Sequence, residues 1–150
     1  MAKSRNDIIA AFTREVTKLN IGFKQYLQSK LRQNNIDLTF EMLQVLGCLW
    51  RSDGINQQEI ANITVKDKAS MTYLIDNLVK RNLVYRQEDA NDRRNKLIFL
   101  TKEGKFMQTA VQPLVHEMYS IAGMDIKLDP INGIFKELEK MLENLIQATE

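Results

Sequence analysis

The sequence predicts a mainly α-helical protein with one small β-hairpin. Near both ends of the chain, apolar residues recur every three or four positions, which is the period of an amphipathic helix. Between residues 83 and 101 this period is lost, and two short strand-like segments flank a polar, turn-rich stretch. The 150 residues, 44% of them hydrophobic and 27% charged, suffice for a globular domain that needs no disulfide or metal to fold.

The first helix is expected over residues 6–33, and the polar segment 33–35 ends it. Thr39 can cap a second helix, and residues 52–54 form a turn signal. The apolar stripe of the first helix is Ile8, Phe12, Val16, Leu19, Phe23, Leu27 and Leu31, and that of the second is Met42, Leu43, Leu46, Leu49 and Trp50.

Two shorter helices follow. Asn56 with Glu59 three positions later is a capping-box arrangement that starts a helix ending near Ile63. Asp67 then caps a helix over residues 67–81, and Asn82 stands where a left-handed residue would end it. The inward face of this helix is expected to be Met71, Leu74, Ile75 and Leu78.

Residues 83–88 and 96–101 are the two expected strands, joined by the charged tip 89–95. Thr101 can cap a helix continuing to about Ala122, in which Pro113 bends the helix or breaks one hydrogen bond. Asp129 followed by proline predicts the start of a last helix. Its apolar stripe is Ile131, Ile134, Phe135, Leu138, Met141, Leu142, Leu145 and Ile146.

This order of elements predicts a winged helix-turn-helix over residues 37–104. The helices of residues 1–36 and 105–150 are more apolar than that small core requires, which favours mutual burial in a symmetric dimer over a monomeric bundle. The expected dimerisation residues are Ile8, Phe12, Ile134, Leu138, Met141 and Leu145.

Charge is unevenly distributed along the chain. Residues 64–105 carry ten basic and six acidic side chains, although the formal net charge of the whole chain is only +2. A basic middle between slightly acidic flanks is typical of a nucleic-acid reader, and a solvated face is the alternative interpretation.

Residues 59–61, 70–72 and 74–84 resemble the helix-turn-helix of the MarR family of bacterial transcription regulators, and residues 92–104 are similar to its D-x-R…L-T-x-x-G wing signature. The resemblance implies a homodimer, with helices from both chain ends at the interface, on a pseudo-palindromic operator. It also implies a repressor released by a small ligand or oxidant. Tyr73 replaces a frequent Arg, Asn82 replaces the usual Gly, and the cysteine that oxidant sensors carry near the chain start is absent.

Double-stranded DNA is thus the expected partner, with helix 67–81 in the major groove and wing 89–95 in the minor groove. Helical geometry turns Ala69, Thr72, Tyr73 and Asp76 outward. The residues expected to approach bases are Lys68, Ala69, Ser70, Thr72 and Tyr73, and Lys66 with the helix N-terminus is expected to hold phosphate. By resemblance Arg94 enters the minor groove and Asp92 holds its guanidinium, while Arg93, Asn95 and Lys96 meet phosphates.

The resemblance also implies a pocket between the dimer helices and the winged domain for a small aromatic or amphipathic ligand. Phe23, Leu27, Met42 and Met107 are its candidate residues, and ordinary core packing is the alternative for each. Cys48 is expected to be buried rather than redox-active.

Other functions find no support in the sequence. One Cys and one His exclude a multi-cysteine or His–His zinc site, and no phosphate-binding or nucleophile motif is present, so we expect no enzyme, cofactor or metal. The longest apolar stretch, residues 45–50, is too short to span a membrane, which favours a cytoplasmic protein. A winged-helix protein-interaction module without specific DNA binding is the alternative function.

Overall fold

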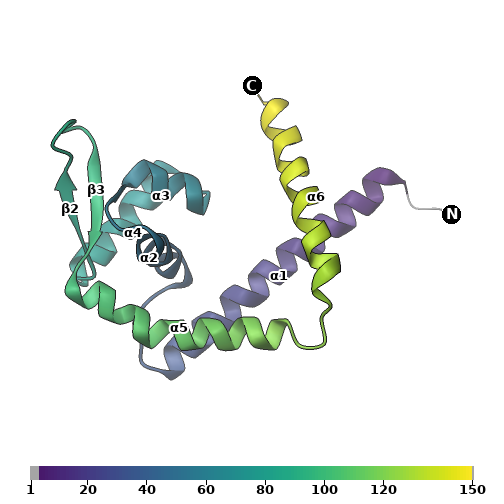
Figure 1. The fold of residues 1–150 in the computed structure, drawn as a ribbon, viewed down its shortest axis with the longest axis horizontal. Coiled ribbons are helices and arrows are strands. Elements are labelled where there is room, and N and C mark those ends of the chain that lie inside the picture. The colour runs from purple at the N-terminus through teal and green to yellow at the C-terminus, as the bar shows by residue number, and fades with distance from the viewer. Residues whose placement is uncertain (1–3, 150) are drawn as a thin grey trace. The chain divides into compact units, whose positions relative to one another are not determined.

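The computed structural model describes residues 4–149, so residues 1–3 and 150 of the predicted dimerisation region lie outside the described residues (Figure 1). The chain divides into two compact units, which are unit 1 (Met1–Met118) and unit 2 (Tyr119–Glu150). The elements are α1 (Arg5–Gln33), α2 (Phe40–Arg51), β1 (Ile55–Asn56), α3 (Gln57–Thr64), α4 (Lys68–Lys80), β2 (Val84–Glu88), β3 (Lys96–Leu100), α5 (Lys102–Ala122) and α6 (Leu128–Gln147). The mainly α-helical fold with a hairpin wing is confirmed.

Side-chain caps fix the starts of α2 and α3. Thr39 Oγ1 accepts the backbone N–H of Met42 at 3.2 Å, and Asn56 Oδ1 accepts that of Glu59 at 2.7 Å. Each bond satisfies one of the donors that a helix start leaves without a partner. Both caps are the residues expected from the sequence, so local chemistry alone places the starts of α2 and α3.

The end of α4 is a Schellman motif. Asn82 has φ 56°, its N–H donates to Val79 O at 2.9 Å, and the N–H of Leu83 donates to Leu78 O at 3.0 Å. Asparagine tolerates the left-handed region better than most residues other than glycine, so its place here is as predicted. This turn sends the chain directly from α4 into β2.

The sheet has three strands in the order β1-β3-β2, all antiparallel. The hairpin was predicted to within one residue at each strand, whereas β1 was missed. Only two residues form β1, where Ile55 pairs with Ile98 and Asn56 with Leu97. A strand this short has no detectable period, so its existence depends on the partner strand.

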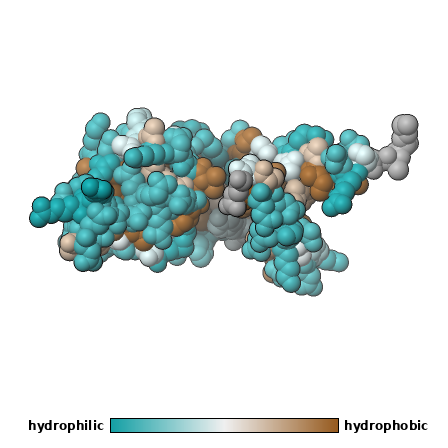
Figure 2. Space-filling view, turned by 90° about the horizontal axis from the view of Figure 1, so that it is seen from above, coloured by the Kyte–Doolittle hydropathy of each residue, from teal (hydrophilic) through white to brown (hydrophobic). Residues whose placement is uncertain are grey.

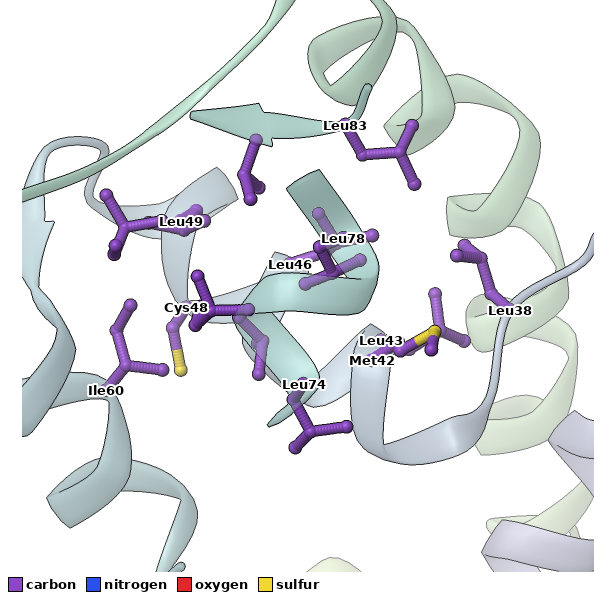
Figure 3. Close-up of a cluster of buried hydrophobic side chains, with 14 of the residues drawn as sticks. Leu38, Met42, Leu43, Leu46, Cys48, Leu49, Ile60, Leu74, Leu78 and Leu83 are labelled. Carbon is purple, nitrogen blue, oxygen red and sulfur yellow. The ribbon is translucent and has the colours of Figure 1, made fainter. Parts of the chain in front are cut away.

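One hydrophobic core lies within unit 1, and Figure 3 shows part of it. Leu46 and Leu49 of α2 meet Leu78 of α4, and Ile98 of β3 closes the cluster. Cys48 is buried in the same core, and burial raises the pKa of its thiol more than the nearby Arg51 lowers it. The expected burial of Cys48 is thus confirmed, and its lack of a redox role stays a prediction.

Gly104, at the start of α5, permits the closest backbone approach in this unit. A Cβ built there would lie 2.0 Å from Leu83 O. Thr101 N–H donates to the same Leu83 carbonyl at 3.0 Å, and Thr101 Oγ1 accepts the N–H of Gly104 at 2.9 Å. The indole N–H of Trp50 donates to Gly104 O at 2.9 Å, so α2, α5 and the α4–β2 junction meet at this point.

In unit 2, α6 begins at Leu128, one residue before Asp129. The predicted cap at Asp129 is therefore wrong. Asp129 and Pro130 lie inside the first turn, where proline is accepted because those N–H groups have no partner within the helix. No residue of α6 is buried in the described chain, and its apolar side chains remain accessible. The face of the molecule in Figure 2 is largely hydrophilic, with hydrophobic patches. Within residues 4–149, no helix is both long enough and apolar enough to cross a membrane.

Gly104→Ala should lower the free energy of unfolding by about 1–3 kcal/mol, because the new methyl group cannot share space with Leu83 O. Urea denaturation measures the loss. Gly47→Ala is the matched control, since its Cβ would meet only Arg51 Nη1 at 3.7 Å and alanine favours a helix. Equal stability of Gly104→Ala and the unsubstituted protein would contradict the close approach.

Candidate nucleic-acid interface

Unit 1 presents α3, α4 and the β2–β3 hairpin together (Figure 1). A tight turn joins the two helices, and the hairpin follows α4 directly. The inner face of α4 is buried as predicted, because Met71, Leu74, Ile75 and Leu78 all belong to the core. The opposite face of α4 is therefore held outward by the same packing.

That outward face is narrower than helical geometry alone predicts. Lys68, Ala69 and Ser70 are exposed, and Tyr73 is 68% exposed. Thr72 is only half-buried by contrast, and its hydroxyl donates to Lys68 O at 2.9 Å. These positions form the first two turns of α4, the part that can reach base edges if the helix enters a major groove.

Two side chains predicted to point outward are instead paired within the protein. Gln57 Nε2 donates to Thr72 Oγ1 at 2.8 Å, and Arg86 Nη2 lies 2.6 Å from Asp76 Oδ1. Both residues stay partly exposed, as expected of the outward face, but their pairing with Gln57 and Arg86 was not predicted. Helical period places them at the border of the buried face, and the neighbouring α3 and β2 decide their contacts.

The N-terminus of α4 is capped by Asp67. Its carboxylate accepts the backbone N–H of Ser70 at 2.8 Å and the Ser70 hydroxyl at 2.8 Å. The backbone hydrogen bond, followed by the hydroxyl, lowers the pKa of Asp67, so the cap stays ionised near neutral pH. Ser70 is thereby committed to the cap while its backbone remains at the exposed start of the helix.

Lys66 is half-buried beside the start of α2. Burial raises the pKa of Glu41, but the hydrogen bond from Lys24 and the charges of Lys24 and Lys66 outweigh it, so the pKa is lowered. The positive charge of Lys66 therefore interacts with the Glu41 carboxylate. Its charge is less available to a phosphate than that of the exposed Lys68.

The wing tip is shaped by short polar contacts. Asp92 Oδ1 accepts the backbone N–H of Arg94 at 3.0 Å, which is an Asx-type turn. The guanidinium contact expected from the resemblance is not the one observed, so Asp92 fixes the backbone and leaves the Arg94 side chain to other groups. Asn95 Nδ2 donates to Asp89 Oδ2 at 3.2 Å, and Lys96 pairs with Glu88 at 2.7 Å across the hairpin.

A cavity of about 250 Å³ brings the wing and the helices together. Lys68 comes from α4, Arg94 and Lys96 come from the wing, and Gln57 and Gln58 come from the start of α3. The two glutamines were not predicted as site residues. The sequence does place them at the first two residues of a helix. Only the tertiary fold shows that this helix start lies beside the wing.

The turn between α3 and α4 holds a strained residue. Val65 has φ 53° and ψ 52° and is 91% exposed. The left-handed region is costly for a β-branched residue, and the other positive-φ residues of the described chain are Asn35, Asn82, Asp125 and Gly54. Lys66 N–H donates to Ala61 O at 2.9 Å, so the turn itself imposes this conformation.

The four candidate pocket residues lie in one apolar cluster of unit 1. Leu27 and Met42 are buried in the core, and Phe23 and Met107 are partly buried against it. Their packing is that of core side chains. All four therefore belong to, or pack against, the core of unit 1, and a ligand pocket at these residues stays a prediction.

Two helices joined by a tight turn, with a β-hairpin on the same core, define a winged helix-turn-helix domain. A profile of the MarR family matches residues 38–96. Residues 38–96 are thus similar to the winged domain of the MarR family of transcriptional regulators.

The chain is also similar in sequence to transcriptional regulators. The transcriptional regulator TtmR of Methylorubrum extorquens is 29% identical over 109 residues, which are 73% of this chain and 55% of TtmR. The transcriptional regulator HosA of Escherichia coli O127:H6 is 31% identical over 78 residues, which are 52% of this chain and 58% of HosA. The chain thus spans just over half the length of these two relatives.

Solved structures share the fold. The S. aureus MepR–DNA complex is 29% identical, covers 89% of this chain and 97% of the MepR chain, and superposes with a TM-score of 0.78. A MarR transcriptional regulator from Methanosarcina mazei is 26% identical, with a TM-score of 0.77 over 93% of this chain and 99% of that chain.

Val65→Asn should raise the free energy of unfolding by up to about 1 kcal/mol, because asparagine adopts the left-handed conformation at lower cost. Val65→Ala is the control, since alanine removes the β-branch but lacks the side-chain amide that favours the left-handed region in asparagine. Thermal or urea denaturation compares both variants with the unsubstituted protein. If neither variant is more stable than the unsubstituted protein, the strain assigned to this turn is absent.

Proposed function

We propose that this protein is a homodimeric DNA-binding transcriptional regulator that acts as a repressor released by a small ligand. The observation that carries the proposal is the joint presentation of the exposed start of α4 and the wing on one core. A helix that can enter a major groove and a hairpin that can enter the adjacent minor groove are thereby fixed to each other. The match of residues 38–96 to the MarR family profile supports the same function.

In this proposal α4 supplies the major-groove contacts. Lys68, Ala69, Ser70 and Tyr73 are exposed on its first two turns and can approach base edges or phosphates. Thr72 acts through Gln57, which it holds in place. The positive dipole end of the helix favours a phosphate beside it, with Lys66 nearby, although Asp67 occupies the N–H of Ser70.

The wing supplies the minor-groove contact. Arg93 and Arg94 stand on a narrow hairpin tip, and arginine is suited to the concentrated negative potential of a narrow minor groove. Asp92 holds the backbone at Arg94, while Asn95 and Lys96 flank it toward the phosphates. The similar S. aureus MepR structure is a complex with DNA, which supports such a role for this fold.

Homodimerisation follows from apolar surface that the single chain leaves uncovered. Ile8 is exposed on α1 and Phe12 is partly so; on α6, Ile134 and Leu145 are exposed, and Leu138 and Met141 are partly so. Large apolar stripes of this kind are covered in stable proteins, and a second copy of the chain is the simplest cover. We assign residues 1–36 and 105–150 to this interface and residues 37–104 to DNA binding.

The ligand is proposed to be a small aromatic or amphipathic molecule that repacks the cluster of Phe23, Leu27, Met42 and Met107. One observation beside the cluster supports a polar end on that molecule. The Tyr26 hydroxyl is shielded from solvent and makes no hydrogen bond of ordinary geometry among the described residues, and the Lys30 ammonium is the polar group that interacts with it. A buried hydroxyl is stabilised when a ligand group or a water pairs with it.

Arg94→Ala should weaken binding to operator and to scrambled duplex alike, because it removes a charge at the wing tip of each protomer. The slope of log affinity against log salt should fall by about one unit per charge lost, or about two per dimer. Lys68→Ala should differ, with a loss that depends on the sequence offered, because it lies beside the major groove.

Fluorescence anisotropy at two salt concentrations tests both variants. Fold and dimerisation should be unchanged, since both residues are exposed. Wild-type affinity and slope for Arg94→Ala would mean that the wing does not enter DNA. A flat salt response of the unsubstituted protein would instead support the protein-interaction alternative.

Leu138→Glu should dissociate the dimer, because it places a charge at the centre of the α6 stripe. Sedimentation velocity measures the mass in solution, and circular dichroism reports whether the chain remains folded. Lys136→Glu introduces the same side chain on the opposite face of α6 and should leave the dimer intact. A folded dimer of Leu138→Glu would place the interface elsewhere.

A further inference from the structure

The cavity between the wing and the two helices has a chemical character that the separate residue roles do not explain. Its lining residues include Lys68, Arg94 and Lys96, and none is acidic. The polar groups that complete it are the amides of Gln57, Gln58 and Asn95. A concave site with three cationic side chains and no carboxylate favours an oxyanion and disfavours a metal ion.

Two of the three cationic side chains that line the cavity are available to bind an anion. Among residues 4–149, neither the Lys68 ammonium nor the Arg94 guanidinium is paired with a carboxylate, whereas Lys96 is bound to Glu88 at 2.7 Å. The available pair comes from different elements, α4 and the hairpin tip. Both side chains line one cavity, so a single anion can be held between them.

The glutamine side chains are held in place by the protein. Gln57 Nε2 donates to Thr72 Oγ1 at 2.8 Å, and Gln58 Nε2 donates to Asn62 Oδ1 at 2.9 Å. Each amide nitrogen has two N–H groups, so one donor on each glutamine stays free for a ligand. The cavity therefore offers fixed neutral donors next to the two charges.

The volume of the cavity further limits the size of the ligand that it can hold. At about 250 Å³ the cavity is smaller than the roughly 300–1,000 Å³ typical of sites for drug-sized molecules. One phosphate group is an oxyanion that fits this scale and carries several acceptor oxygens. In a duplex, the strand that separates the major from the minor groove must pass between a helix in one and a wing in the other.

We propose that this cavity seats one DNA backbone phosphate, on the strand that runs between α4 and the wing. Lys68 and Arg94 clamp that phosphate from opposite sides, and Gln57 and Gln58 donate to its oxygens. This inference rests on the proposed DNA-binding function and goes beyond it. It makes Lys68 and Arg94 two halves of one phosphate site, in addition to their separate groove contacts.

The test is a scan of a duplex that the protein itself selects from a random pool. Single phosphates are replaced one at a time by neutral methylphosphonates, and affinities are measured for the unsubstituted protein, Lys68→Gln and Arg94→Gln. One position in each half-site should cost the unsubstituted protein about tenfold in affinity. At that same position, both variants should lose less than about twofold, because the contact is already weakened.

Lys140→Gln is the control, since Lys140 lies on α6 and its pair with Glu143 is exposed. It should show the same methylphosphonate profile as the unsubstituted protein. If Lys68→Gln and Arg94→Gln lose their sensitivity at different phosphates, or at none, the shared seat is wrong while DNA binding stands. Failure of the unsubstituted protein to bind any duplex would refute the proposed function itself.

A free phosphate ion has the same chemistry as the backbone group, so a second arm separates the two. Inorganic phosphate and chloride are compared as competitors of DNA at equal ionic strength. Phosphate should displace the unsubstituted protein more strongly than chloride does, and the Lys68→Gln/Arg94→Gln double variant should lose that difference. A difference that persists in the double variant would place the anion site elsewhere and overturn the proposal.

Discussion

The junction at Leu83 and Gly104 is the constraint on which the rest of the winged domain depends. Leu83 lies between the turn that ends α4 and the start of β2. Its carbonyl accepts the N–H of Thr101 at 3.0 Å, and a Cβ at Gly104 would lie 2.0 Å from that oxygen. Thr101 Oγ1 also donates to Asn82 O at 2.7 Å. Helix, wing and α5 are thus joined by backbone contacts that leave little freedom between them. The Arg86–Asp76 pair adds a partly exposed link worth at most about 1 kcal/mol.

Local signals in the sequence predict most of this unit. Thr39, Asn56, Asp67 and Asn82 each satisfy a helix terminus through bonds to residues within a few positions, so their roles follow from short-range chemistry. The alternation of the hairpin is equally local. What could not be predicted is the part that depends on a distant partner, as β1 does on β3.

The same distinction explains the candidate site. Residue types and the family signature predicted that Lys68 and Arg94 matter, but their convergence on one cavity requires the packed fold. The contact between Thr72 and Gln57 was not predicted, because helical period describes one helix and carries no information about Gln57 on the neighbouring helix. The side chain of Asp92 was assigned to a guanidinium when the nearer donor is a backbone N–H. The contact of Thr72 is tertiary, whereas that of Asp92 lies within the hairpin tip and is local.

The central claim is that one rigid unit places α4 in a major groove and the wing in the neighbouring minor groove of each half-site. Dimethyl sulfate probing tests it directly, because the reagent modifies guanine N7 in the major groove and adenine N3 in the minor groove of one duplex. On a duplex selected by the protein, we predict protection in both grooves of two half-sites, centred about 10–10.5 base pairs apart or a multiple of that spacing. Protection confined to one groove, or to a single half-site, would contradict the account.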